Sequence, residues 1–281
     1  MLFVLQKEML DAGEFNTQSV CNILSKGEYA KVHGYGILGI RELTMKEAER
    51  LKKLAYKRNN INLIPVGSLE FTEKFLKLVY GVDKLNTIGV PKALGEVDSI
   101  MNRKYMVEYG KNFMDKLRGE HRIREASIDA VSVAANFYNG KGYLREYESS
   151  PVIFNINPEK IYEVAETVRL CAEHRVYVVR GKVEANVQYA GRFGVDLDMD
   201  TVNEAIRIYD ALPSGAKSYA MDFVVSPRGT SLTGIKTFCE IGIHSMVIGN
   251  SLLYAIADGV KYFIEENVPV ETYGNGRFFD E

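Results

Sequence analysis

The chain of 281 residues carries 35 Lys and Arg against 37 Asp and Glu, a formal net charge of -2 at pH 7. This balance excludes the strongly basic composition that usually marks a nucleic-acid binder. With 46% hydrophobic and 26% charged residues, the composition is that of an ordinary globular protein, in one large domain or two smaller ones.

The sequence also argues against export and membrane insertion. No apolar run approaches the roughly 20 residues that a membrane helix needs. The first ten residues, MLFVLQKEML, are too soon charged for a signal peptide. Cys21, Cys171 and Cys239 are far apart and odd in number, which predicts buried free thiols in a reducing compartment. We therefore expect a cytoplasmic protein.

The first 81 residues predict a small α/β unit. Residues 1–6 form an apolar strand, and residues 18–24 fit either a short helix or a second strand. Apolar residues recur at helical spacing over residues 42–58, where Thr44 and Glu47 form a capping box. A strand follows over residues 60–67, and Ser68 then caps a helix.

Residues 82–98 are the expected domain boundary, because they hold two glycines, a proline and little periodicity. We divide the chain there into a lobe over residues 1–95 and a second part over residues 96–281. The second part begins with a predicted helix over residues 99–119 and a strand that starts near Arg122. Residues 130–156 are aromatic and prone to β structure.

The second half of the chain predicts paired strands. Residues 176–179 and 183–189 form a hairpin about Arg180-Gly181-Lys182, because glycine accepts a positive φ. A helix over residues 199–212 precedes two further strands. We expect these strands over residues 218–226 and 234–243, broken at Pro227-Arg228-Gly229, and a final helix over residues 251–266.

Each of these last two strands carries one carboxylate within an apolar run. Asp222 lies in the first strand and Glu240 in the second. Burial of an unpaired charge is costly, so each carboxylate needs a partner, and a metal ion is one such partner. The alternative is that both are edge-strand carboxylates that face solvent.

The order of these motifs resembles the C-terminal half of an ATP-grasp ligase domain, and more narrowly its RimK-related clade in phages and bacteria. The motifs are E-x-R at residues 173–175, M-D-F at residues 221–223 and C-E-I at residues 239–241. The stretches YEVAETV at 162–168 and PVGSLEF at 65–71 fit as well. The resemblance implies an α/β and α+β protein: an ATP-grasp fold behind an N-terminal α/β pre-ATP-grasp lobe.

The resemblance also implies roles for individual residues. Asp222 and Glu240 would be the ligands of Mg²⁺. Arg175 and Glu173 would be catalytic, with Arg175 on the acyl-phosphate oxygens, whereas the alternative is an Arg–Glu pair on a sheet face. Glu166 would meet the adenine and ribose of ATP, and its alternative is a solvated helix glutamate.

The sequence departs from the family pattern at two places. The asparagine that usually follows the metal-binding glutamate by two residues is Gly242 here. The expected strand lysine is replaced within RIREAS, where Arg124 is the candidate for contact with the nucleotide. Lys104 and Lys141 are further candidates for basic contacts with ATP.

The implied activity is an ATP-dependent carboxylate–amine ligase, which forms an amide bond through an acyl-phosphate with ATP and Mg²⁺. Its partners would be a peptide, a protein or a small amino acid, in the cytoplasm of a bacterium or a phage-infected cell. The alternative is a decayed ATP-grasp protein that acts as a binding or structural module. A nucleic-acid end-joining enzyme ranks last, because the K-x-D-G motif is absent.

The oligomeric state stays open. Tyr254, Tyr262 and Phe278 could serve a homodimer, whereas core packing is the alternative use of the two tyrosines.

Overall fold

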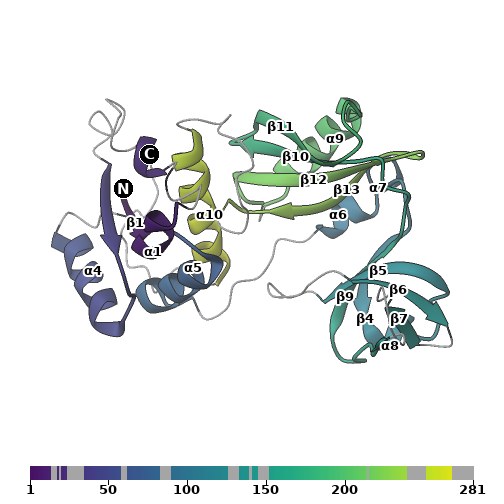
Figure 1. Ribbon diagram of the computed structural model, residues 1–281, viewed down its shortest axis with the longest axis horizontal. Coiled ribbons are helices and arrows are strands. Elements are labelled where there is room, and N and C mark those ends of the chain that lie inside the picture. The colour runs from purple at the N-terminus through teal and green to yellow at the C-terminus, as the bar shows by residue number, and fades with distance from the viewer. Residues whose placement is uncertain are drawn as a thin grey trace.

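The computed structural model describes residues 1–13, 18, 20–23, 35–57, 62–82, 90–125, 133–138, 141–144, 152–213, 215–238 and 251–267. Within these ranges the strands form a sheet of three, a sheet of four and a sheet of six. Figure 1 shows the three-stranded sheet at one end of the molecule and the other two sheets beside each other at the far end.

The N-terminal part is a parallel sheet covered by helices. Its strands lie in the order β2-β1-β3. The elements are β1 (Leu2–Gln6), α1 (Lys7–Asp11), β2 (Gly36–Ile40), α4 (Met45–Lys57), β3 (Leu63–Val66), α5 (Leu69–Phe75) and the π-helix η1 (Leu76–Tyr80). The predicted caps are confirmed: the Glu47 N–H donates to Thr44 Oγ1 at 3.2 Å and the Phe71 N–H donates to Ser68 Oγ at 3.1 Å.

The six-stranded sheet is antiparallel, in the order β4-β9-β5-β6-β7-β8. The elements of this region are α6 (Lys92–Gly95), α7 (Asp98–Met101), β4 (Tyr105–Tyr109), α8 (Gly110–Phe113), β5 (Gly119–Glu125), β6 (Val133–Tyr138), β7 (Lys141–Leu144), β8 (Val152–Phe154) and β9 (Ile161–Glu166).

The predicted helix over residues 99–119 is wrong. The structure places α7, β4 and α8 in this segment. Asn102 has a φ of 46° and ends α7, and the chain then pairs with β9 as a strand. Tertiary pairing therefore overrides the helical propensity of a run rich in Met and Lys.

The four-stranded sheet is built from two antiparallel hairpins, in the order β11-β10-β12-β13. Its elements are β10 (Ala172–Val179), β11 (Lys182–Gly191), α9 (Met199–Asp210), β12 (Ser218–Ser226) and β13 (Gly229–Lys236). The first hairpin is confirmed, although its turn holds only Arg180 and Gly181, with φ values of 51° and 79°. The second strand of the other hairpin begins at Gly229 rather than at residue 234, because Ser226 already pairs with Gly229 across the turn.

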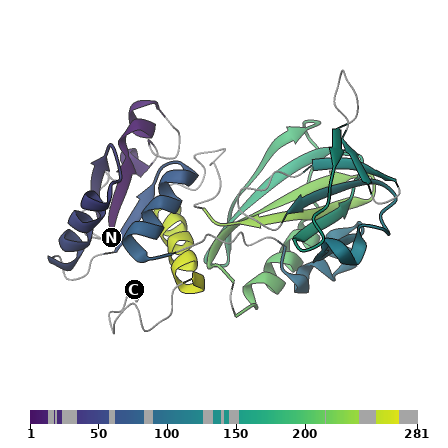
Figure 2. The ribbon, with the colours of Figure 1, turned by 90° about the horizontal axis from the view of Figure 1, so that it is seen from below.

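The helix α10 (Ser251–Asn267) joins the two ends of the molecule. It contacts β3 and η1 on one side and β10 and β12 on the other, and it lies between the sheets in Figures 1 and 2. Tyr254 and Tyr262 pack against this shared core, as the core-packing alternative expects. Phe278 lies outside the described residues, so the homodimer stays a prediction, as does the division at residue 95.

The two faces of the four-stranded sheet have different neighbours. Val176, Tyr219 and Met221 point into a core shared with α6, α7 and α9. Tyr177, on the opposite face, packs in the core that holds α10. Side chains alternate along a strand, so Arg175 shares the face of Tyr177, and this end of that face borders a hollow.

Two of the three cysteines are described, and both are free and half-buried. Cys239 lies outside the described residues. Among the helices that the structure describes, none combines the length and the apolar character needed to span a bilayer.

Candidate functional site

A hollow of about 200 Å³ lies between the six-stranded and the four-stranded sheets. Its walls carry four cationic and three anionic side chains. The residues from the region of the six-stranded sheet are Arg103, Tyr105, Arg122, Glu163 and Ala165. Those from the four-stranded sheet are Glu173, Arg175, Tyr189, Asp222, Thr233, Gly234 and Lys236.

A buried ion pair forms one wall of this hollow. Arg175 and Asp222 lie opposite each other on the neighbouring strands β10 and β12. Arg175 donates from Nε to Asp222 Oδ1 at 2.6 Å and from Nη2 to Oδ2 at 2.9 Å. Lys236 Nζ lies 3.8 Å from Oδ2. Burial alone would lower the pKa of Arg175, but the hydrogen bonds and charge of Asp222 raise it overall, so the guanidinium stays charged.

This geometry decides between two of the alternatives left by the sequence. Asp222 is 8% exposed and lies on an interior strand, so the solvent-facing, edge-strand alternative is wrong for it. The described carboxylate partner of Arg175 is Asp222, on the neighbouring strand. Glu173 lines the same hollow, two residues before Arg175 on β10.

An aromatic ring lies against the guanidinium of this pair. Tyr189, on β11, has its ring centroid 5.5 Å from Arg175 Cζ. Burial, and then the charges of Asp222 and Glu173, raise the pKa of Tyr189 above its ordinary value. The phenol is therefore protonated at neutral pH and can donate a hydrogen bond.

Two arginines on the opposite wall were not predicted from the sequence. Arg103 donates from Nη2 to the Leu232 carbonyl at 3.4 Å, while its Nε is buried with no hydrogen-bond partner within the described residues. Burial, and then the charge of Arg122, lower the pKa of Arg103. Two cations held this close favour an anionic ligand between them and the opposite wall.

A sequence signal existed for only one of these arginines. Arg122 belongs to the RIREAS stretch that was singled out, but the prediction chose Arg124 two residues later. Arg124 lies on β5 opposite Glu163, and its side chain is outside the described residues. Arg103 falls within the segment that was wrongly predicted to be a helix, so its position beside β13 could not be inferred.

The other predicted cofactor residues lie away from the hollow or outside the described part. Lys104 lines a second hollow of about 560 Å³ with Met106 and Glu108, on the other face of β4. Lys141 pairs with Tyr138 between β7 and β6, and its side chain is outside the described residues. Their contacts with ATP stay predictions.

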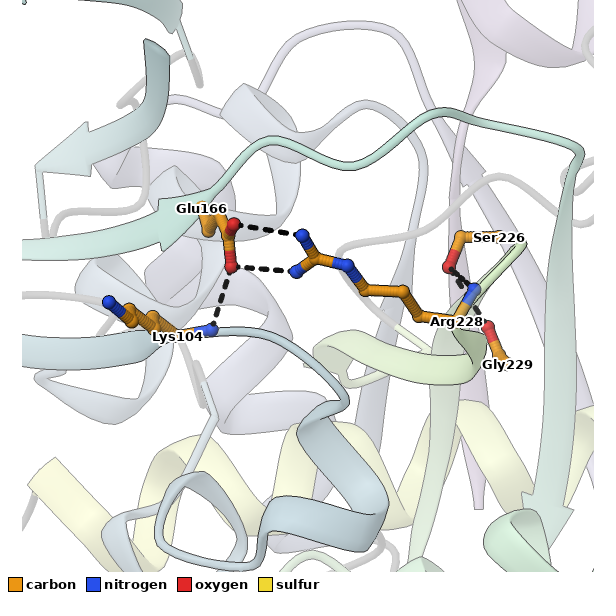
Figure 3. A network of polar contacts seen from close by, with 5 residues as sticks. All are labelled: Lys104, Glu166, Ser226, Arg228 and Gly229. Carbon is orange, nitrogen blue, oxygen red and sulfur yellow. Dashed lines mark hydrogen bonds and ion pairs between the residues drawn. The ribbon is translucent and has the colours of Figure 1, made fainter. Parts of the chain in front are cut away.

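Glu166 is the last residue of β9, so the solvated-helix alternative for it is wrong. It forms a two-pronged ion pair with Arg228, from Nη1 to Oε2 at 2.9 Å and from Nη2 to Oε1 at 3.2 Å (Figure 3). Its neighbour Ala165 lines the hollow. A contact of Glu166 with adenine or ribose stays a prediction.

The predicted metal pair is only half visible. Glu240 and Gly242 lie outside the described residues. Across the described ranges, no three His, Cys, Asp or Glu side chains are grouped as a metal site would need. The assignment of Asp222 and Glu240 to a metal therefore stays a prediction.

Comparison with known proteins identifies the fold. Residues 130–234 match the model of an ATP-grasp domain, the second family of its clade. N5-carboxyaminoimidazole synthetase from Staphylococcus aureus, solved with ADP, has a TM-score of 0.50 at 10% identity, over 92% of this chain and 76% of that one. D-alanine–D-alanine ligase from Bacillus anthracis, solved with ATP, has a TM-score of 0.49 at 12% identity, over 95% and 99% of the two chains. A search of curated proteins found no match.

Proposed function

Because this chain has the ATP-grasp fold, we propose that it is an ATP-dependent carboxylate–amine ligase that forms an amide bond through an acyl-phosphate. The hollow between the two sheets carries the proposal, because it combines clustered cations with carboxylates on facing walls. The similar synthetase of S. aureus was solved with ADP, which supports a nucleotide as the ligand.

Three cations of the hollow are assigned to the phosphates. Arg103 and Arg122 extend from the side of the six-stranded sheet and Lys236 from β13. Arg103 has the strongest claim, because its buried Nε lacks a partner among the described residues. A phosphate oxygen would supply the acceptor that this N–H needs, in a charge-assisted hydrogen bond.

Arg175 is assigned to the acyl-phosphate oxygens. Its bonds to Asp222 use Nε and Nη2. A guanidinium has five N–H donors, so it can serve a ligand in the hollow as well as Asp222. The Asp222 carboxylate thus fixes the direction in which the guanidinium points. Such fixed donors stabilise charge that develops during a reaction without reorganising.

The carboxylates of the hollow suit a magnesium ion. Each oxygen of Asp222 accepts one bond from Arg175 and keeps lone-pair capacity, and Glu173 lines the same hollow. Mg²⁺ prefers carboxylate and water oxygens. Asp222 would hold the ion, with Glu240 as the second ligand that the resemblance implies. When bound, Mg²⁺ gathers phosphate oxygens and offsets their charge.

The reaction has two steps. An oxygen of the substrate carboxylate attacks the γ-phosphorus, the bond to the β-phosphate oxygen breaks, and ADP leaves. The amine nitrogen then attacks the acyl carbon, phosphate leaves, and the nitrogen loses a proton as the amide forms. We assign Glu173 to receive this proton, because it lies on the same face of β10 as Arg175.

The substrate class is a peptide or protein carboxylate, or a small amino acid. The assay that tests the proposal measures ADP release with panels of carboxylates and amines. Release that requires both substrates, with an amide product of matching mass, is the expected result. ADP release that is independent of either substrate would contradict ligation.

One observation favours a second candidate function, a non-catalytic binding module. The carboxylate expected to hold a metal is already satisfied by Arg175 in the described structure. Gly242 and the missing strand lysine point the same way. A protein of this kind would bind a nucleotide or a partner without releasing ADP, so the same assay separates the two functions.

A further inference from the structure

An ion pair bridges the two sheets at the point where the chain crosses between them. Glu166 ends β9 of the six-stranded sheet, and β10 of the four-stranded sheet begins at Ala172. Arg228 occupies the turn between β12 and β13. Figure 3 shows the Arg228 guanidinium reaching across to the Glu166 carboxylate.

Both ends of this ion pair are held in place by further hydrogen bonds. Ser226 Oγ accepts from the Arg228 N–H at 3.1 Å and donates to the Gly229 carbonyl at 3.3 Å, which fixes the turn. The Lys104 N–H donates to Glu166 Oε2 at 3.5 Å. Figure 3 shows these contacts converging from three segments of the chain.

A neighbouring contact joins the same segments. Asn102 Nδ2 donates to the Thr230 carbonyl of β13 at 2.6 Å. The segment before β4 is therefore held to the start of β13, beside the Glu166–Arg228 pair. The two sheets that border the hollow thus meet along one edge through polar contacts.

Exposed ion pairs add little to the stability of a fold, and the Arg228 side chain is 58% exposed. This pair, however, joins residues 62 apart in sequence on different sheets. Ala165, next to Glu166, lines the hollow. Opening the pair would therefore change the spacing of the two sheets more than the stability of either one.

We propose that Arg228 is a positioning residue: its ion pair with Glu166 latches the two sheets at the spacing that binds nucleotide, and the latch opens for nucleotide exchange. The proposal rests on the nucleotide-dependent function proposed above. It assigns to Glu166 a partner within the chain that sequence reasoning did not supply.

The test compares Arg228→Gln, Arg228→Lys, Glu166→Gln and the swapped pair Glu166→Arg with Arg228→Glu. The first readout is the Kd for a non-hydrolysable ATP analogue. We expect Arg228→Gln and Glu166→Gln to weaken binding about two- to fivefold, as an exposed ion pair allows. Arg228→Lys should lose less, and the swapped pair should recover affinity because it restores opposite charges.

The second readout is hydrogen exchange without nucleotide. The Glu166 N–H donates to the Lys104 carbonyl at 2.9 Å, and the Cys171 N–H donates to the Val225 carbonyl at 2.8 Å. Both amides flank the crossing between the sheets, so they should exchange faster in the glutamine variants and at wild-type rates in the swapped pair. Arg207→Gln is the control, because Arg207 makes a similar fork on Glu204 within α9.

Unchanged exchange in the glutamine variants would overturn the latch. A swapped pair that stays as weak as Glu166→Gln would also overturn it, since Glu166 would then act directly on the nucleotide. If the wild type binds no nucleotide, the proposed function fails, and the exchange data still decide whether the latch exists.

Discussion

A single buried ion pair sets what the candidate site can do. Arg175 and Asp222 satisfy each other on adjacent strands, and the hydrogen bonds point the guanidinium along the wall of the hollow. Removal of one partner leaves the other charge buried, which costs far more than the pair contributes. Variants of either residue therefore change stability as well as ligand binding.

We expect Asp222→Asn to lower the free energy of unfolding by about 1–3 kcal/mol, because Arg175 loses a charged acceptor in a buried site. Urea denaturation of Asp222→Asn, Arg175→Gln and the double variant forms a thermodynamic cycle. The double variant should cost less than the sum of the single variants. Additive costs would show that the pair is not coupled in solution.

Arg103 should behave in the opposite way. Its buried Nε has no partner among the described residues, so Arg103→Met should leave stability unchanged or raise it. The same change should weaken ATP-analogue binding roughly tenfold to a hundredfold, the loss expected for a charge-assisted hydrogen bond. Arg118→Met is the control, because Arg118 lines the hollow on the other face of β4. Equal affinities of the two variants would remove Arg103 from the phosphate site.

At the scale of elements, the sequence reports pairs of strands better than isolated segments. The hairpin of β10 and β11 was predictable because Gly181 accepts the positive φ that a two-residue turn needs. β4 was missed because its strand character comes from pairing with β9, which is distant in sequence: the first pair joins Tyr105 to Ala165. Local patterns cannot report such pairing.

The same distinction explains the candidate site. Asp222, Glu173 and Arg175 were predicted to belong together, since they lie on strands with clear patterns, and the structure places them in one hollow. Arg103 was missed because it lies in the mispredicted segment. The partner of Asp222 was also missed, because strand register is not visible in one strand alone.

The latch at the end of β9 should depend on pH. The hydrogen bonds from Arg228 lower the pKa of Glu166 below its ordinary value of 4.5. A lowered pKa means that the ion pair is intact above pH 4.5 and is lost as the pH falls through the lower folded value. Carboxyl chemical shifts of Glu166 over a pH titration should show a midpoint below 4.5. That midpoint should return toward 4.5 in Arg228→Gln, and a midpoint that does not move would contradict the pairing.

At the scale of the whole molecule, α10 connects the N-terminal part to the four-stranded sheet. Asp258 of α10 is 6% exposed and accepts two bonds from Arg180, at 3.0 and 2.9 Å, and a third from Ser218. Arg180 also lies 4.8 Å from the Tyr254 ring. The turn of one hairpin is thus tied to the helix that completes the core of the N-terminal part.

We expect Asp258→Ala to lower the free energy of unfolding by about 1–3 kcal/mol, because it leaves the buried hydroxyl of Ser218 and the charge of Arg180 without this acceptor. Asp200→Ala, at the exposed start of α9, is the control and should cost less than about 1 kcal/mol. Urea denaturation measures both. Equal costs would mean that the Asp258 contacts do not hold α10 in place.

Calorimetric titration of the intact protein with a non-hydrolysable ATP analogue, with and without Mg²⁺, tests the nucleotide-dependent function most directly. The hollow of clustered arginines and carboxylates predicts binding in the micromolar range that requires the metal. Binding in neither condition would contradict an ATP-dependent ligase and would leave the fold in the service of a different ligand or a protein partner.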